Sequence, residues 1–251
     1  MDNRTLPDGY QPNIDLLADQ VILVTGAGDG IGRAAAVTYA RYGATVILLG
    51  RTVSKLEAVY DHIVSLDQQE PAIIPADIST LGIKTLNEIA DVIHEQYGRL
   101  DGLLHNAGIL GERVPVEHYD MQLWDQVMQV NFNGAVTLTR FLLPLLRLSK
   151  NASLIFTSSD VGATPRAYWG PYAVSRYALE GFAQLLADEL ENTSNISVKV
   201  VNPGAVRTRT RAASHPNEDP GTLKTVEDLM PLYLYLMDPA SNDANGYRLI
   251  S

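Results

Sequence analysis

The sequence contains no cysteine, so disulfide bonds, thiolate metal sites and cysteine nucleophiles are excluded. It also lacks a long hydrophobic run, because the most apolar stretch, 141–146, is too short to span a bilayer and is followed by Arg147. Basic residues are scarce, with 19 Lys and Arg against 29 Asp and Glu. The resulting net charge of -10 argues against nucleic acid or an anionic membrane as a partner.

The first 20 residues lack the two parts of a secretory signal peptide, a basic start and an apolar centre. They are polar and acidic instead, with Pro7, Gly9 and Pro12 among them. The absence of cysteine also suits a reducing compartment. We therefore expect a cytoplasmic protein.

Short apolar runs alternate with longer helical patterns along the 251 residues, of which 46% are hydrophobic. The runs predict strands at 21–25, 45–49, 72–74, 102–105, 153–157, 197–201 and 247–250. The patterns between them predict helices at 31–41, 54–66, 81–97, 123–148, 172–191 and 226–237. Continuously apolar strands alternating with helices indicate a parallel sheet covered on both faces. We predict an α/β protein with a single doubly wound (Rossmann) domain at 20–251, a seven-stranded parallel sheet and an N-terminal extension at 1–19.

The segment at about 207–224 departs from this alternation. It contains Pro216, Pro220 and Gly221, several charges and little periodicity. A long loop inside a compact domain suggests a lid over a site, and the alternative is a mobile surface insertion. The lid is favoured because the segment directly follows a strand.

A glycine-rich turn follows the first predicted strand and opens the first helix. Glycine permits a tight turn and close approach of the backbone to a pyrophosphate, whose charge the helix N-terminus favours. A structural turn without a ligand is the alternative. The candidate cofactor residues of this turn are Gly26, Gly28, Asp29, Gly30, Ile31 and Gly32.

The end of the second predicted strand bears on the choice between cofactors. Enzymes that bind NAD usually carry a carboxylate there for the ribose, and this chain has Gly50 followed by Arg51. A cation near the start of a helix opposes the helix dipole, and a bound 2′-phosphate would remove that penalty. We therefore expect NADP(H) to be preferred over NAD(H). The alternative is that Arg51 is an ordinary solvated arginine. The negative charge of Asp29 in the glycine turn also argues slightly against NADP.

Tyr172 and Arg176 are separated by four residues, so they lie on one face of a helix, close enough to interact. A cation beside a phenol favours the phenolate and makes the hydroxyl a usable proton donor or base. Ser158 and Ser159 follow the fifth predicted strand, where ligand-binding residues belong in such sheets. They lack the Gly-x-Ser-x-Gly surroundings of a nucleophilic serine, so we expect one of the two to hydrogen-bond a substrate oxygen.

These motifs resemble the short-chain dehydrogenase/reductase family, with one departure: the family has Lys where this chain has Arg176. The resemblance covers about 20–250, and the phrases at 39–51 and 218–220 are similar to its bacterial YciK-like group of oxidoreductases. It implies that Ser159, the second serine of the pair, acts on the substrate, and that Asp77 and Ile78 contact the adenine. The alternative is that Asp77 or Ser79 merely caps the next helix, and both can hold, with Ser79 as the cap. It also implies a water relay at Asn131, although an Asn that bonds a neighbouring loop is the alternative. The further cofactor contacts that it implies are Asn106, Ala107, Gly108, Tyr172, Arg176, Pro203, Gly204, Val206 and Thr208.

Position 105 also departs from the family, which has Asn before Asn106 where this chain has His105. We interpret His105 as a packed or hydrogen-bonded residue at a strand end, not as a catalytic base. Arg176 keeps the charge of the family's Lys, and its planar fork can bind both ribose hydroxyls. It is bulkier and does not release a proton near neutral pH, so a proton relay through it would be slower.

We therefore expect an NADPH-dependent oxidoreductase acting on a small carbonyl or alcohol, with Asn131, Ser159, Tyr172 and Arg176 as the catalytic residues. The alternative is an NADP-binding regulator or scaffold with little turnover, and a sugar-nucleotide epimerase or dehydratase is a weaker third option. No metal, nucleic acid or membrane partner is expected. The resemblance also implies a homodimer or homotetramer that pairs through the helices predicted at 123–148 and 172–191.

Overall fold

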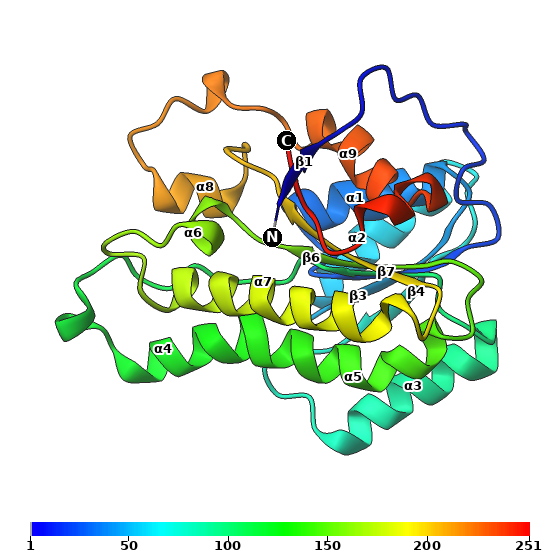
Figure 1. Ribbon diagram of the computed structural model, residues 1–251, viewed down its shortest axis with the longest axis horizontal. Coiled ribbons are helices and arrows are strands. Elements are labelled where there is room, and N and C mark those ends of the chain that lie inside the picture. The colour runs from blue at the N-terminus through cyan, green and yellow to red at the C-terminus, as the bar shows by residue number, and fades with distance from the viewer. Residues whose placement is uncertain (1) are drawn as a thin grey trace.

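A computed structural model describes residues 2–251 as three layers, with helices above and below one parallel sheet (Figure 1). The strand order is β1-β8-β7-β6-β5-β2-β3-β4, and all neighbouring strands within residues 2–251 pair in parallel. The strands are β1 (Asn3–Thr5), β2 (Val21–Thr25), β3 (Thr45–Gly50), β4 (Ala72–Pro75), β5 (Gly102–His105), β6 (Ala152–Thr157), β7 (Ile196–Asn202) and β8 (Arg248–Ile250). The predicted doubly wound α/β domain is confirmed, with eight strands instead of seven.

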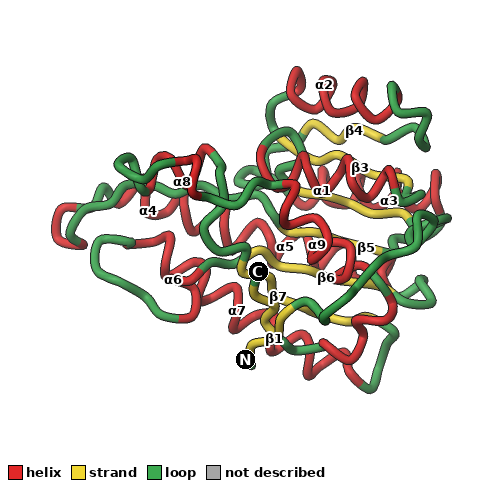
Figure 2. Tube along the Cα trace, turned by 90° about the horizontal axis from the view of Figure 1, so that it is seen from above, coloured by secondary structure: helices red, strands yellow, loops and turns green. Residues whose placement is uncertain are grey.

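The helices fill the two outer layers (Figures 1 and 2). They are α1 (Gly30–Arg41), α2 (Val53–Val64), α3 (Ile83–Tyr97), α4 (Met121–Met128), α5 (Gly134–Leu146), α6 (Asp160–Ala163), α7 (Gly170–Glu191), α8 (Arg209–Ser214) and α9 (Met230–Met237). Short 3₁₀ turns occur at 116–118, 220–222, 227–229 and 239–244. Among residues 2–251, none of these helices has both the length and the apolar character that crossing a bilayer requires.

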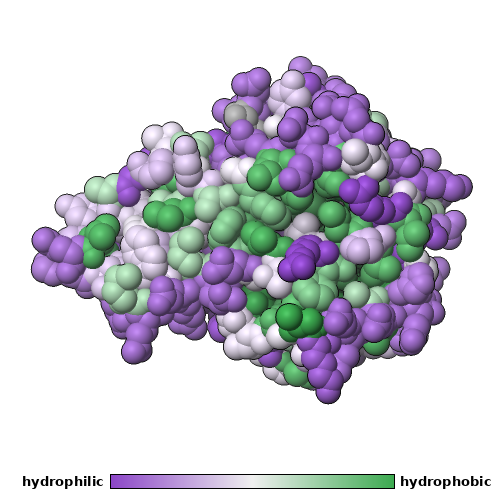
Figure 3. Space-filling view, turned by 60° about the horizontal axis from the view of Figure 1, so that its bottom comes forward, coloured by the Kyte–Doolittle hydropathy of each residue, from purple (hydrophilic) through white to green (hydrophobic). Residues whose placement is uncertain are grey.

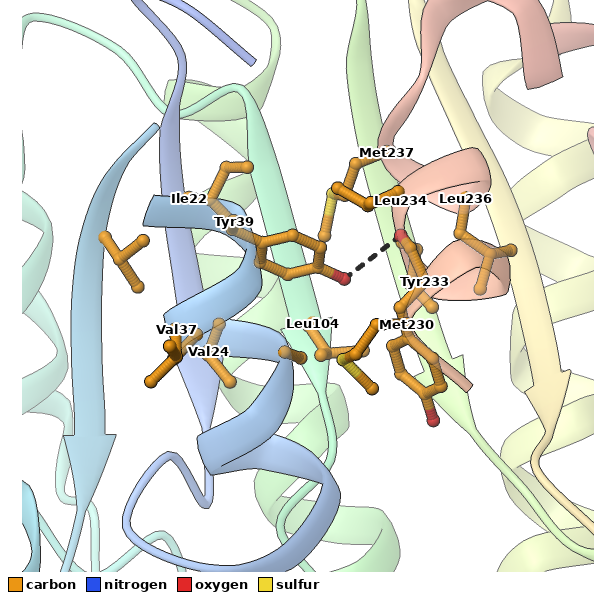
Figure 4. Packing of buried hydrophobic residues seen from close by; sticks show 14 of the residues in the cluster. Ile22, Val24, Val37, Tyr39, Leu104, Met230, Tyr233, Leu234, Leu236 and Met237 are labelled. Carbon is orange, nitrogen blue, oxygen red and sulfur yellow. Dashed lines mark hydrogen bonds between the residues drawn. The ribbon is translucent and has the colours of Figure 1, made fainter. Parts of the chain in front are cut away.

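Each face of the sheet has its own hydrophobic core. Residues of α1, α2 and α9 pack on one face, and residues of α3, α5 and α7 pack on the other. Strand β2 is buried at all five positions, which explains why it appears in the sequence as a continuous apolar run. Figure 4 shows the first core, where Tyr39 of α1 reaches α9 and its hydroxyl donates to the carbonyl of Tyr233 at 3.3 Å.

Within residues 2–251 three of the named elements, β1, α6 and α8, lie where the sequence predicted none. The eighth strand, β1, comes from the N-terminal extension and pairs with β8, Asn3 opposite Arg248. The segment at about 207–224 was predicted to be a loop, but it contains helix α8, because the Thr208 side chain accepts from the amide of Arg211 and caps the helix. The predicted helix at 123–148 is also interrupted by a π-helical turn, Gln129–Asn133, between α4 and α5.

Candidate active site

A cleft opens at the carboxyl ends of the strands, between β2 and β5. Because β3 lies on one side of β2 and β5 on the other, the loops that follow them diverge and leave a crevice. The cleft has a volume of about 670 Å³, and the glycine turn, the ends of β5, β6 and β7, the start of α7 and helix α8 line it. All the predicted site residues line it except Gly32 and Asn131, which contact lining residues from behind.

Two glycines of the turn between β2 and α1 leave no room for a side chain. A Cβ atom on Gly26, whose φ is +68°, would lie 3.0 Å from the Cα of Ala107. A Cβ atom on Gly32 would lie 2.3 Å from the carbonyl oxygen of Gly26. The turn therefore packs against the end of β5, and the free amides at the start of α1 face the cleft. These residues fit the pyrophosphate of a dinucleotide.

Asp29 caps α1, its carboxylate accepting from the amide of Gly30 at 2.9 Å. The same carboxylate lies 2.6 Å from the Lys55 ammonium and 2.8 Å from the Arg209 guanidinium. The hydrogen bond from Lys55 is the main cause of the lowered pKa of Asp29. The negative charge that counted against a 2′-phosphate is thus matched by two cations.

At the end of β4, Asp77 accepts from both the amide and the hydroxyl of Ser79, at 2.9 and 2.6 Å. These bonds, with a smaller contribution from the charge of Arg51, lower the pKa of Asp77. The suggestion that Ser79 caps the next helix is wrong, since α3 begins at Ile83 with Gly82 as its N-cap. The Arg51 guanidinium has no hydrogen bond or ion pair within residues 2–251.

The end of β5 forms the floor of the cleft. Asn106, Ala107 and Gly108 line it, and a Cβ atom on Gly108 would collide with the Arg176 guanidinium. His105 is buried just before them, stacked on Phe156 at 5.0 Å, with Nε2 2.8 Å from the Thr139 hydroxyl. Burial lowers the pKa of His105 to about 3, so the ring is neutral at pH 7. His105 has the packed and hydrogen-bonded environment that its sequence context predicts.

Asn131 lies in the π-helical turn and is almost fully buried. Its Oδ1 accepts from the amide of Ile109 at 2.8 Å, and its Nδ2 donates to the carbonyl of Ile109 at 2.9 Å and to the Ser175 hydroxyl at 3.1 Å. Both amide hydrogens are therefore used. The bonds to Ile109 are the contact with a neighbouring loop that the sequence offered as the alternative to a water relay. The π-helical turn around Asn131 is also a feature that often marks functional sites.

The two serines after β6 differ in their partners. Ser158 is buried, and its hydroxyl donates to the Glu180 carboxylate. The hydroxyl of Ser159 is buried at the cleft and has no hydrogen-bond partner within residues 2–251. An unpaired buried hydroxyl carries a free-energy cost that a ligand oxygen would relieve. Ser159 is therefore the serine available to a ligand.

Tyr172 and Arg176 are in contact on α7, and both are at most 9% exposed. The Arg176 guanidinium carbon lies 5.2 Å from the centre of the Tyr172 ring. Its NH1 donates to the carbonyl of Thr157 at 2.8 Å, so the guanidinium links α7 to the end of β6. The cation thus lies over the phenol ring, and the sequence spacing did not indicate its bond to Thr157.

The segment after β7 closes the remaining side of the cleft. Pro203, Gly204, Val206 and Thr208 line it, and α8 extends from Thr208. The methyl carbon of Thr208 would lie 3.8 Å from a Cβ atom on Gly30, so the start of α8 is next to the glycine turn.

The arrangement of glycine turn, serine and tyrosine can be compared with known families, and the model for short chain dehydrogenases matches residues 20–219. The chain belongs to the short-chain dehydrogenase/reductase family. It is 51% identical over 237 residues to the uncharacterized oxidoreductase YciK of Escherichia coli K12, which covers 94% of this chain and 93% of that protein. The likeness to the YciK-like group is thereby confirmed.

Two crystal structures extend this similarity. A short chain dehydrogenase from Shigella flexneri 2a, complexed with NADP, matches with a TM-score of 0.92 at 49% identity over 95% of this chain and 99% of that one. One from Escherichia coli CFT073, complexed with NADPH, matches with a TM-score of 0.92 at 50% identity over 95% and 99% of the two chains. As a member of this family, the chain is an oxidoreductase.

Sequence reasoning missed three buried residues that position this dehydrogenase site. Thr25 accepts from the amides of Asn106 and Ala107 at 3.0 and 3.1 Å, and so fixes the end of β5. The position of Thr25 directly before the glycine turn was the signal in the sequence from which this role could have been predicted.

The other two missed residues are Glu180 and Arg248, which form a buried pair. Arg248 Nε lies 3.3 Å from Glu180 Oε1 without hydrogen-bond geometry, and Arg248 NH2 donates to the carbonyl of Ser159 at 2.8 Å. Because Glu180 also accepts from Ser158, the pair holds both serines of the loop that follows β6. Glu180 follows Arg176 by one helical turn, but the sequence contains no signal that pairs it with Arg248.

Proposed function

We propose that this protein reduces a carbonyl compound with NADPH, and that Tyr172 is the general acid. The observation that carries the proposal is the unpaired hydroxyl of Ser159, which lines the same cleft as Tyr172 and the glycine turn. A hydroxyl left without a partner beside a phenol and a dinucleotide cradle supports the binding of a carbonyl oxygen.

In this proposal Ser159 donates a hydrogen bond to the carbonyl oxygen as negative charge develops on it. Bound NADPH supplies the hydride. Tyr172 gives its hydroxyl proton to the same oxygen, which completes the alcohol and leaves a phenolate. The guanidinium over the ring stabilises that phenolate, because a cation close to a developing negative charge lowers its free energy.

Return of the proton to Tyr172 is the step that Arg176 affects. A guanidinium does not release a proton near neutral pH, so the proton must come from water. We propose that Asn131 helps to hold such a water. Since both of its amide hydrogens are used, it can only accept from the water, through Oδ1.

We further propose that NADP(H) is preferred over NAD(H). Gly50 leaves no carboxylate to repel a 2′-phosphate, and Arg51 lines the cleft with its guanidinium unpaired. Lys55, in the first turn of α2, also lines the cleft. Equilibrium titration of both cofactors tests this, and an equal Kd for NAD and NADP would show that Arg51 has no such role.

A homodimer or homotetramer is also proposed, paired through α5 and α7. Val174, Tyr177 and Leu185 are 44, 60 and 52% exposed, and they form an apolar stripe along α7. Figure 3 turns the lower face of the molecule forward and shows apolar side chains across its middle. A monomeric mass in light scattering would contradict the proposal.

The deciding experiment measures NADPH oxidation across aldehydes, ketones and quinones in the wild type and in Arg176→Lys. We expect slow turnover in the wild type and a faster rate in the variant, because an ammonium can pass on a proton. Tight NADPH binding without turnover in either protein would instead support a regulator. Equal rates in the two proteins would contradict the role given to Arg176.

A further inference from the structure

The cleft has the opposite charge balance to the rest of the molecule. Six of its lining residues are Lys or Arg and three are Asp, whereas the whole chain has 19 basic and 29 acidic residues. A positive cleft in a negative protein concentrates anions. The six cations are Arg51, Lys55, Arg166, Arg176, Arg209 and Arg211.

The cofactor end of the cleft contains only part of this excess of basic residues. Lys55 and Arg209 bind Asp29, and Arg51 lies near Asp77, so these three cations surround the glycine turn. The other end, beyond Tyr172, contains further positive groups that the phosphates of a dinucleotide on the glycine turn do not explain.

At this second end Trp169 forms a wall next to Tyr172, with the two ring centres 5.8 Å apart. The Arg113 guanidinium lies 4.5 Å above the indole, and the His215 ring centre is 5.9 Å away from it. Arg113 also donates to the carbonyl of Ser214 at the end of α8. These contacts fix the indole in place, and cation–π contacts with Arg are favourable.

The cations here differ in whether they are already paired. Arg113 is used by Trp169 and Ser214, and Arg211 makes two bonds of 2.6 Å to Glu218. The side chain of Arg166 is exposed, lines the cleft and has no hydrogen bond or ion pair within residues 2–251. Arg166 is therefore the cation available to a ligand.

The surroundings of His215 show the same excess of positive charge. Its pKa is lowered first by burial, and then by the charges of Arg211, Arg113 and Arg166, which the one carboxylate of Glu218 only partly offsets. The cleft wall also contains the carboxylate of Asp160, which accepts from the side-chain amide of Asn202 at 2.7 Å. Positive charge thus prevails at this end.

The wall of the cleft beside Tyr172 is apolar. Leu110 and Trp169 pack against the cluster of Val161, Tyr172 and Ala173. A ligand that spans this wall needs an apolar body, a carbonyl at the tyrosine and an anionic group at the arginine.

We propose that the substrate is a carbonyl compound with an apolar body and a carboxylate or phosphate group, and that Arg166 binds this anionic group. The inference rests on the proposed reductase activity, since it places the carbonyl oxygen between Ser159 and Tyr172. Arg166 then selects the anionic compound over its neutral counterpart by charge and by bidentate hydrogen bonds.

The test compares para-carboxybenzaldehyde, its methyl ester and para-formylphenyl phosphate as substrates. We expect the wild type to favour one or both anionic compounds over the ester in kcat/KM, and the preferred compound distinguishes carboxylate from phosphate. Arg166→Gln should lower the anion-to-ester ratio by up to about five-fold, and Arg166→Glu should lower it further. The control is Lys84→Gln, which removes one charge from a residue 91% exposed on α3 and should leave the ratio as in the wild type.

A second readout does not depend on turnover. Calorimetric binding of para-carboxybenzyl alcohol and its methyl ester to the NADP-loaded protein should show the same preference, again lost in Arg166→Gln. No anion preference in the wild type, or an unchanged ratio in Arg166→Gln, overturns the proposal. Binding that prefers the anion without any NADPH oxidation would overturn the reductase assignment and leave the anion site standing.

Discussion

The two ends of the cleft are built by different means. The cofactor half consists of β2, α1, β3 and the end of β5. It depends on the absence of side chains, because Gly26 and Gly32 let neighbouring backbone segments pack closely together. Its charged groups are exposed. The catalytic half, made of β6, α7 and β8, depends on buried side chains that are present, among them Arg176, Glu180 and Arg248. The first is specified by backbone conformation, and the second by polar contacts between residues far apart in the sequence.

The ion pairs illustrate the difference. The Lys55, Asp29 and Arg209 side chains are 37, 53 and 76% exposed, so each contact contributes about 0–1 kcal/mol. The Arg248 and Glu180 side chains are 7 and 8% exposed, and removing one partner of a buried pair costs about 3–5 kcal/mol. Damage to the cofactor half should therefore appear in binding, and damage to the catalytic half in turnover or stability.

The largest expected effect separates chemistry from binding. Tyr172→Phe removes the proton donor of the catalytic half and should lower kcat/KM by about 10²–10⁴-fold. NADPH affinity should fall far less, because Tyr172 is one of many expected cofactor contacts and the glycine turn is untouched. Steady-state kinetics and fluorescence titration measure the two quantities, with Tyr97→Phe on α3 as the control. A parallel loss of NADPH affinity would show that the two halves are not separable in this way.

The next effect tests the buried pair. Glu180→Gln keeps the shape of the side chain but leaves the Arg248 charge unpaired, so the free energy of unfolding should fall by about 3–5 kcal/mol. The matched control is Glu189→Gln, at an exposed position of the same helix, with a change within about 0.5 kcal/mol. Urea denaturation gives both values. Similar losses in both variants would mean that the burial of Glu180 has no energetic consequence.

A third prediction contrasts two glycines, one from each half. Gly32→Ala places a Cβ atom 2.3 Å from the Gly26 oxygen and should destabilise the protein by about 1–3 kcal/mol and weaken NADPH binding. Gly181→Ala on α7 meets nothing within 4 Å, so better helix propensity should stabilise the protein by about 0.5–1 kcal/mol. Thermal unfolding and cofactor titration distinguish them. Tolerance of alanine at Gly32 would contradict the close packing of the turn.

The last effect is absent at pH 7 and is a pH dependence beneath the cofactor half. Because the folded pKa of His105, about 3, lies below the ordinary value of 6.5, the unfolded chain binds a proton between these pH values and the folded chain does not. Stability is therefore complete above pH 6.5 and is lost as the pH falls, by up to about 1.4 kcal/mol per pH unit. His105→Asn should flatten this slope in denaturation curves between pH 6.5 and 4, and His94→Asn, at an exposed position of α3, should not.

The same contrast explains how far the sequence could predict the structure. Buried strands such as β2 and the glycine turn leave a local pattern, so the sheet, its doubly wound arrangement and the cofactor half followed from it. Strand β1 could not be predicted in this way, because its three polar residues carry no apolar pattern and form a strand only by pairing with β8. Helix α8 was obscured by the prolines that follow it, although Thr208 was an available cap.

Side-chain contacts in the catalytic half were harder to predict. Spacing placed Arg176 and Tyr172 on one face of a helix, but not the bond from Arg176 to the Thr157 carbonyl. The Glu180–Arg248 pair depends on the register of β8 beside β7, which no local signal encodes.

Arg176 also changes which covalent reactions the site can undergo. Lysine amines condense with aldehydes and ketones to form Schiff bases, whereas a guanidinium stays protonated and does not act as such a nucleophile. Within residues 2–251 the one lysine that lines the cleft, Lys55, is at the cofactor end and bound to Asp29. An aldehyde substrate of the proposed reductase would therefore meet no primary amine beside Tyr172, and it would not be trapped there as an imine.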